Sequence, residues 1–133
     1  MAEPTRGLVD TSVIVDHDLL APELLPEESA IAAVTLAELA AGPHATDEEE
    51  ERARRQDRLQ WATATWDPLA FDADAARAYG RVFAATRVAG RSSRTRLADL
   101  LIAATAVANS LDLYTRNPMD FVGLEDILTV ISV

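Results

Sequence analysis

The sequence predicts a single α/β domain, a doubly wound α/β/α sandwich with a central, mainly parallel sheet. Short apolar segments alternate along the chain with longer segments of helical periodicity, which is typical of βαβ units. The length of 133 residues corresponds to one domain spanning residues 1–133. With 49% hydrophobic and 26% charged residues, the chain has enough apolar material for a packed core. Because crossover helices cover a parallel sheet, we expect helices on both of its faces.

The first half of the chain is predicted to form two strands and three helices. The first strand is apolar and ends on Asp10, and the first helix follows it directly. Gly42-Pro43 ends the second helix, and Asp67-Pro68 ends the third. The predicted elements are the strands 7–10 and 29–34 and the helices 12–20, 35–41 and 46–66.

The third helix begins with an acidic run at 47–51, which Thr46 is expected to cap. Acids in the first turn of a helix interact favourably with its dipole, and arginines four residues later are placed for ion pairs. The expected pairs are Glu48–Arg52, Glu50–Arg54 and Glu51–Arg55. We therefore interpret the acidic run as a solvated helix start.

The second half of the chain continues the alternation of strands and helices. Asp72 is expected to cap the first helix of this half, and a loop at 90–93 precedes a strongly apolar helix. β-branched residues near the end of the chain predict a final strand. The predicted elements are the strands 69–71, 113–115 and 127–131 and the helices 72–89 and 95–110.

The composition excludes several kinds of catalytic chemistry. The chain has no cysteine, which excludes disulfides, thiolate zinc sites and cysteine nucleophiles. All 12 basic residues are arginine, so a P-loop lysine and a Schiff-base lysine are excluded as well. The only imidazoles, of His17 and His44, lie in different sequence contexts. The side chains that remain for catalysis are mostly carboxylates.

The charges are distributed unevenly along the chain. A net charge of −10 argues against non-specific affinity for nucleic acid over the whole surface. Between Ala75 and Ala98, however, there are six arginines and no acid, and such a local band can bind phosphate. The sequence contains neither a signal-peptide pattern nor an apolar run long enough for a membrane span, so we expect a cytoplasmic protein.

Two acids follow or interrupt apolar segments at positions that suggest a site. Asp10 closes the first strand, and ligands of parallel sheets bind outside the carboxyl ends of the strands. An alternative role is capping of the next helix by Asp10 or Ser12. Glu38 lies within a short apolar helix, although Thr35-x-x-Glu38 also matches a capping box.

Asp99 is the acid that is hardest to explain as a surface residue. It interrupts the apolar segment 97–104 and lies on the same helical face as Ile102 and Ala106. Because burial of an unpaired carboxylate is costly, Asp99 has to face a cation, a polar partner or a wet cleft. The structural alternative is a salt bridge to one of four arginines: Arg91, Arg94, Arg96 or Arg116.

The turn after the strand 113–115 carries hydroxyl, amide and carboxylate oxygens, on Thr115, Asn117 and Asp120. In a parallel sheet these oxygens and the acids above converge at one edge. Clustered carboxylates raise one another's pKa unless a cation neutralises them, and Mg²⁺ or Mn²⁺ takes oxygen ligands and bridges to phosphate. The combination indicates a metal site that activates water and stabilises charge on a scissile phosphate.

Four motifs, at 9–12, 35–39, 97–106 and 115–121, together resemble those of the PIN-domain ribonucleases. More narrowly, they resemble the VapC toxins of bacterial type II toxin–antitoxin systems. The resemblance implies the α/β/α fold and a Mg²⁺-dependent endoribonuclease, in which Mn²⁺ can substitute, that cleaves structured or translation-related RNA and inhibits growth. It also implies a VapB-like antitoxin as partner and a homodimer.

The resemblance also assigns roles by position. By this resemblance, the acids of the metal site are Asp10, Glu38 and Asp99. The supporting hydroxyls are those of Ser12 and Thr115. The family often has aspartate where this chain has Asn117, so either Asn117 or Asp120 fills the fourth catalytic position.

The arginines just ahead of Asp99 are candidates for contact with RNA phosphate or with an acidic antitoxin tail. They are Arg91, Arg94 and Arg96. Two other functions stay open at this point. One is another metal-dependent phosphodiesterase, such as a phosphatase or DNA nuclease. The other is a non-catalytic binding module in which Glu38 caps a helix and Asp99 pairs with arginine.

Overall fold

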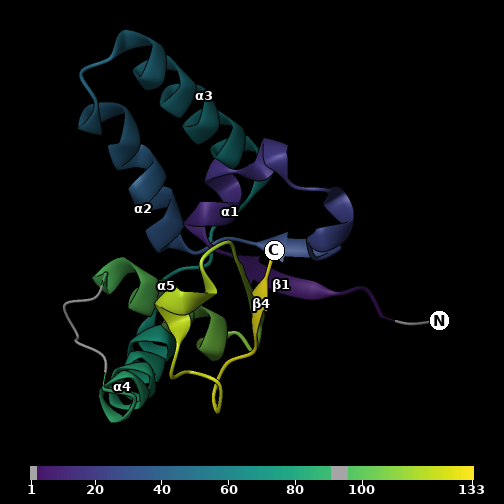
Figure 1. Cartoon of the computed structure of the whole chain (residues 1–133), viewed down its shortest axis with the longest axis vertical. Coiled ribbons are helices and arrows are strands. Elements are labelled where there is room, and N and C mark those ends of the chain that lie inside the picture. The colour runs from purple at the N-terminus through teal and green to yellow at the C-terminus, as the bar shows by residue number, and fades with distance from the viewer. Residues whose placement is uncertain (1–2, 91–95) are drawn as a thin grey trace.

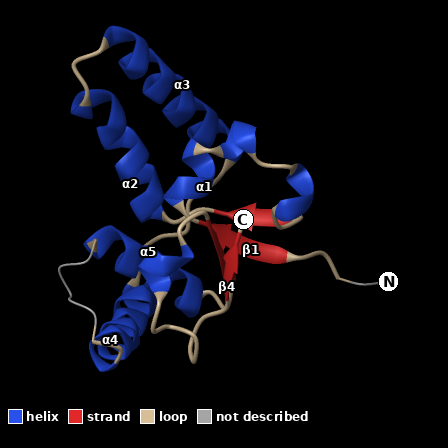
Figure 2. Cartoon of the chain, viewed as in Figure 1, coloured by secondary structure: helices blue, strands red, loops and turns tan. Residues whose placement is uncertain are grey.

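The computed structural model describes residues 3–90 and 96–133 and has a four-stranded sheet in the order β2-β1-β3-β4 (Figures 1 and 2). The strands are β1 (Arg6–Val9), β2 (Glu28–Ala30), β3 (Asp112–Thr115) and β4 (Val130–Ser132). Each neighbouring pair is parallel. The predicted parallel sheet is therefore confirmed, and β1 and β3 are its central strands.

Helices cover both faces of the sheet, with α1, α2 and α3 on one side and α4 and α5 on the other (Figure 1). They are α1 (Thr11–Val15), α2 (Ala33–Ala41), α3 (Glu49–Thr65), α4 (Ala73–Val88) and α5 (Leu97–Ala108). Four short 3-10 helices lie at His17–Leu19 (η1), Pro22–Leu24 (η2), Gly42–Ala45 (η3) and Pro118–Phe121 (η4). Over the described ranges, no helix has the length and apolar character that crossing a membrane requires.

Successive residues of the central strands face two separate hydrophobic cores. Leu8 and Leu113 are fully buried in the core beneath α4 and α5. Val9 and Tyr114 belong to the core beneath α1, α2 and α3. Side chains alternate across a strand, so a strand that is covered on both faces needs apolar residues at consecutive positions. This packing confirms the doubly wound sandwich.

Gly7 allows the two central strands to approach each other beside an aromatic ring. A Cβ atom at this position would lie 2.3 Å from Cε1 and 2.5 Å from Cδ1 of Tyr114. Gly7 pairs with Asp112, the first residue of β3. The absence of a side chain therefore leaves the space in which the Tyr114 ring packs across β1.

Several predicted boundaries are wrong, and local composition explains the errors. The helix predicted over 12–20 ends at Val15, because the polar residues 16–18 interrupt its apolar face and η1 follows. The strand predicted over 29–34 ends at Ala30, and Ala33 begins α2, as the alanines there favour helix. The final strand occupies 130–132 instead of 127–131.

The segment predicted as a strand at 69–71 makes only one backbone bridge in the described part of the chain, from Leu69 to Ala32. Pro68, which lacks an N–H donor, comes before it, and α4 begins shortly after it, so there is little room for a longer ladder. The predicted cap of α4 is confirmed, since the Asp72 carboxylate accepts a hydrogen bond from the Ala75 N–H at 3.0 Å.

The start of α3 differs from the prediction. Glu48 is the N-cap residue, and the Thr46 hydroxyl accepts a hydrogen bond from the Glu48 N–H before the helix begins. Of the three predicted ion pairs, only Glu51–Arg55 forms among the described residues. Arg52 instead donates to backbone carbonyl oxygens that precede the helix. The acidic run is exposed or half-buried, as expected for a solvated helix start.

Candidate active site

The candidate site lies where the carboxyl ends of β1 and β3 meet. The sheet continues from β1 to β2 on one side and from β3 to β4 on the other, so chain connections diverge here. Ligands of open parallel sheets bind at such a point. Asp10 follows β1, and its N–H donates to the Tyr114 carbonyl at 3.0 Å, which fixes it beside the end of β3.

Asp10 is held rigidly by neighbouring donors. Its Oδ1 accepts from the Ser12 N–H at 2.9 Å and from the Ser12 hydroxyl, while its Oδ2 accepts from the Thr115 hydroxyl at 2.7 Å. Only 4% of Asp10 is exposed. Asp10 is also the N-cap residue of α1, so the alternative role predicted for it, helix capping, is confirmed at the same position as the candidate site. Both predicted hydroxyls, of Ser12 and Thr115, therefore lie against this carboxylate.

Glu38 does not belong to a capping box. Because α2 begins at Ala33, Thr35 and Glu38 both lie inside the helix, and the predicted alternative of a cap is wrong. Instead, Glu38 Oε1 accepts a hydrogen bond from the Thr11 hydroxyl at 2.6 Å. Sequence reasoning did not single out Thr11. Its position between Asp10 and Ser12, in the turn after the first strand, was the available signal.

Asp99 lies in the first turn of α5 and is only 8% exposed. Its Oδ2 is buried and accepts no hydrogen bond from the described residues. Burial is the largest cause that raises the pKa of Asp99, and the Arg96 charge lowers it; with the smaller raising effects of Asp120, Asp10 and Glu38, the pKa comes to about 6. The four carboxylates from four separate segments therefore share one electrostatic environment.

Arg96 forms the salt bridge that the sequence offered as an alternative for Asp99. Its Nε lies 3.4 Å from Asp99 Oδ2, in an orientation that makes no hydrogen bond, and its Nη2 lies 4.0 Å from Glu38 Oε2. Arg116 is engaged elsewhere, because its Nε lies 3.3 Å from Asp16 Oδ2. Arg96 therefore contacts two carboxylates of the candidate site.

The two candidates for the fourth position differ in their placement. Asp120 lies on η4 and acts on the pKa of Asp99 through its charge. Asn117 is exposed, and its backbone N–H donates to the Thr115 hydroxyl at 2.9 Å. The predicted contact residues Arg91 and Arg94, together with most of the predicted loop 90–93, lie outside the described residues.

Comparison with known proteins identifies the family. Residues 7–121 match the PIN domain family. Over 130 residues the chain is 35% identical to Ribonuclease VapC5 of Mycobacterium tuberculosis, in an alignment that covers 96% of this chain and 93% of the relative. The chain belongs to the PIN-domain family. Its similarity to Ribonuclease VapC5 confirms the resemblance to the VapC type.

Solved structures agree with this family. This PIN domain superposes on VapBC-5 from Mycobacterium tuberculosis with a TM-score of 0.82 and 35% identity, covering 98% of this chain and 100% of the other. FitAcB from Neisseria gonorrhoeae gives a TM-score of 0.72 and 25% identity, covering 94% and 96%. VapBC2 from Rickettsia felis superposes with a TM-score of 0.72, covering 97% of this chain and 99% of the other. At 24% identity it supports the fold alone.

The donor atoms of this PIN domain suit a hard divalent cation. Within residues 3–90 and 96–133, no three Asp, Glu, His or Cys side chains are gathered so that they could hold a metal ion together. Mg²⁺, however, is usually bound by one or two carboxylates and several waters. Asp10 and Asp99 are buried carboxylates of this kind, and the buried Asp99 Oδ2 has no hydrogen-bond donor.

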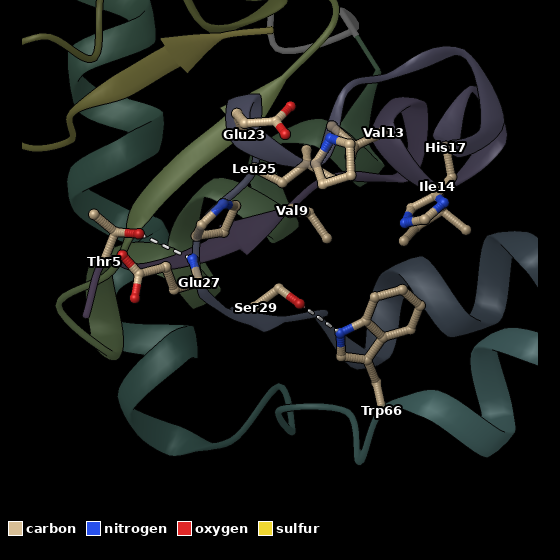
Figure 3. Close-up of a pocket in the computed structure, with 12 residues that line it drawn as sticks. Thr5, Val9, Val13, Ile14, His17, Glu23, Leu25, Glu27, Ser29 and Trp66 are labelled. Carbon is tan, nitrogen blue, oxygen red and sulfur yellow. Dashed lines mark hydrogen bonds between the residues drawn. The ribbon is translucent and has the colours of Figure 1, made fainter.

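A cavity of about 560 Å³ is bordered by α1 and by the segment 22–29 (Figure 3). It is lined by aliphatic residues including Val13 and Ile14, and the Trp66 indole at its wall donates to the Ser29 hydroxyl at 3.0 Å. The carboxylates of the candidate active site do not line it. The cavity is therefore separate from the acidic edge of the PIN domain.

Proposed function

We propose that this PIN domain is a Mg²⁺- or Mn²⁺-dependent endoribonuclease and the toxin of a VapBC-type toxin–antitoxin pair. The observation that carries the proposal is the clustering of acids at the carboxyl ends of β1 and β3, where Thr115 donates to Asp10, Thr11 donates to Glu38, and Arg96 contacts both Glu38 and Asp99. The similarity to Ribonuclease VapC5 and to the VapBC-5 toxin–antitoxin system supports the substrate class and the pairing with an antitoxin. Growth inhibition would follow from cleavage of structured or translation-related RNA in the cytoplasm.

In the proposed reaction three of the carboxylates take two different roles. Asp10 and Asp99 would hold the cation, which when bound neutralises charge and lowers the pKa of a water ligand. Asp10 is already oriented by Ser12 and Thr115, so it needs little reorganisation to bind. The Thr11 hydroxyl occupies Oε1 of Glu38, and this leaves Oε2 to accept a proton from an attacking water once Arg96 has moved.

Two cavities support an antitoxin that docks beside the site. One, of about 460 Å³, is lined by Val15, Trp61 and Arg58, among others, and the next, of about 250 Å³, is lined by Val15, Arg58 and Glu38. Because they share Val15 and Arg58, the two cavities are neighbours beside α1 and α3, and the smaller one reaches Glu38. The linings combine apolar residues with arginines and with acids such as Asp57 and Glu51, so a VapB-like segment would have to present both apolar and charged side chains. We also propose that the PIN domain forms a homodimer.

The alternative of a non-catalytic binding module predicted two features, and only one of them is present. Asp99 does pair with Arg96, but Glu38 is not a helix cap. A binding module with satisfied carboxylates has no reason to take up a divalent cation. Titration with Mn²⁺ therefore discriminates between the two functions, and binding that Asp99→Asn abolishes would favour the nuclease.

The direct test is incubation of the purified protein with total RNA and Mg²⁺, followed by mapping of the 5′ ends. We expect discrete new ends that EDTA and Asp10→Asn abolish. Single-stranded and duplex DNA in parallel reactions separate the ribonuclease from another phosphodiesterase. Cleavage of DNA in preference to RNA, or no cleavage of either, would contradict the proposed substrate. Light scattering, with and without a candidate antitoxin, measures the oligomeric state.

A further inference from the structure

Arg96 has a backbone conformation that arginine rarely adopts. It is the N-cap residue of α5 with a φ of +28° and a ψ of +85°, and it makes no side-chain capping hydrogen bond. A positive φ brings the Cβ atom of an L-residue close to its own backbone, so surrounding contacts must hold such a residue in place. Strained residues of this kind are concentrated at functional sites.

The guanidinium of Arg96 lies between carboxylates from opposite sides of the sheet. It contacts Asp99 on α5 at 3.4 Å and Glu38 on α2 at 4.0 Å. The Asp99 side chain is buried, whereas 62% of the Arg96 side chain is exposed. The positive charge thus reaches a buried carboxylate from the solvent side, and the long side chain can leave without any change in the packed core.

We propose that Arg96 is the internal counter-cation of the candidate metal site, which pairs with Glu38 and Asp99 in the metal-free protein and is displaced by the divalent cation. The proposal rests on the proposed function, because it requires that Asp99 binds a metal beside Glu38. Clustered carboxylates repel one another, and Arg96 reduces that repulsion until a cation arrives. Arg96 and a divalent cation cannot both stay at Asp99 without strong repulsion between them.

Competition predicts the sign of a mutational effect on metal affinity. Arg96→Gln removes the charge while it keeps a polar side chain of moderate length. We expect it to bind Mn²⁺ about threefold more tightly or better, since even one exposed ion pair corresponds to a change of up to about fivefold. Arg96→Lys keeps the charge and should bind Mn²⁺ with nearly the original affinity. Calorimetric titrations at pH 8 keep the carboxylates ionised in all variants.

Arg6→Gln is the matched control. Arg6 Nε lies 3.3 Å from Glu28 Oε2, and 68% of the Arg6 side chain is exposed, so the distance and the exposure of the arginine are close to those of Arg96, although Glu28 is much more exposed than Asp99. Arg6 begins β1, at the end of the strand opposite to Asp10. Its replacement changes the net charge equally but leaves the site untouched. We therefore expect an unchanged affinity for Mn²⁺.

A second measurement follows the side chain itself. In ¹H–¹⁵N spectra of the metal-free protein, the Nε–H signal of Arg96, assigned by its loss in Arg96→Lys, should shift when Mg²⁺ is added. The signal of Arg6 should not shift. Unchanged or weaker Mn²⁺ binding by Arg96→Gln, or a Nε–H signal that stays in place while Mg²⁺ binds, would overturn the proposal but not the metal site. Failure of the original protein to bind either cation would overturn both.

Discussion

Asp10 and Asp99 carry the same functional group in opposite environments. Asp10 accepts hydrogen bonds from the Ser12 N–H and from the hydroxyls of Ser12 and Thr115, whereas the buried Oδ2 of Asp99 accepts none from the described residues. A buried charge without hydrogen bonds destabilises the folded state, and a well-bonded one does not. The two carboxylates therefore contribute to stability in opposite directions, although both are assigned to the same reaction.

The raised pKa of Asp99 predicts a pH dependence of stability in the metal-free protein. Its carboxyl titrates at about 6 in the folded chain, against an ordinary value of 3.8, so the folded state binds the proton more tightly. The contribution of Asp99 to the free energy of unfolding therefore falls as the pH rises from about 4 to 6, and stays low above 6. The full difference is at most about 3 kcal/mol.

Urea denaturation in EDTA at pH 4.5 and pH 7.5 measures this effect. Because other acids also titrate in this range, the informative quantity is the stability of Asp99→Asn relative to the original protein at each pH. We expect the variant to gain relative stability at pH 7.5. An equal difference at both pH values would contradict the shifted pKa.

Substitution of either aspartate by asparagine should lower RNA cleavage by orders of magnitude, because ligands that act as a unit are lost together. The effects on stability should differ. Asp99→Asn removes a destabilising charge and should be at least as stable as the original protein. Asp10→Asn places an amide NH₂ group, itself a donor, against the donors of Ser12 and Thr115, so this variant should be less stable than the original protein. Cleavage close to the original rate in either variant, with folding verified by circular dichroism, would exclude that residue from the site.

Glu38→Gln separates catalysis from structure at a single position. The amide oxygen of glutamine can still accept the hydrogen bond from Thr11, so stability should change by less than about 1 kcal/mol. The charge is lost, so cleavage should be abolished if Glu38 belongs to the site. Thermal melting and the RNA assay are measured on the same preparation. An active variant would give Glu38 a structural role only.

At the level of elements, the sequence predicts best where one local signal dominates. The apolar strand before Asp10 and the cap at Asp72 were both predicted correctly. The alanine-rich stretch 29–34 was divided wrongly between strand and helix, since alanine carries little preference for strands. Asp99 stood out because a charge in an apolar helix is costly. The contacts of Glu38 with Thr11 and with Arg96 depend on how helices pack, and no local pattern encodes that packing, whereas the Arg96–Asp99 pair lies within one helical turn and was among the predicted alternatives.

The close approach of β1 and β3 predicts that Gly7→Ala destabilises the sheet. The new methyl group would overlap the Tyr114 ring, which is buried and cannot move aside cheaply, so we expect a loss of about 1–3 kcal/mol. Gly80→Ala is the matched control in α4, where a Cβ meets nothing within 4 Å, and alanine should stabilise the helix by about 0.5–1 kcal/mol. Urea denaturation compares both. A silent Gly7→Ala would show that the ring relocates.

For the whole molecule, the net charge of −10 opposes the approach of RNA, so local arginines have to hold the backbone. Arg91 and Arg94 lie in the arginine band ahead of Asp99. If they contact phosphate, replacing both by alanine should weaken binding equally across RNA sequences. The slope of log affinity against log salt should also flatten by about one unit per lost contact. Filter binding at several salt concentrations measures this slope. An unchanged slope would show that neither arginine touches the backbone.

The assembly of the acidic edge from both halves of the molecule has a consequence for protein synthesis. Asp10 and Glu38 leave the ribosome early, but Asp99 comes much later, and the hydroxyl that orients Asp10 belongs to Thr115. The strand β3 must pair with β1 before these groups meet. Contacts between residues so distant in sequence form late. If the proposed ribonuclease activity is correct, a nascent chain would therefore not cleave the RNA around it before α5 and β3 have been added.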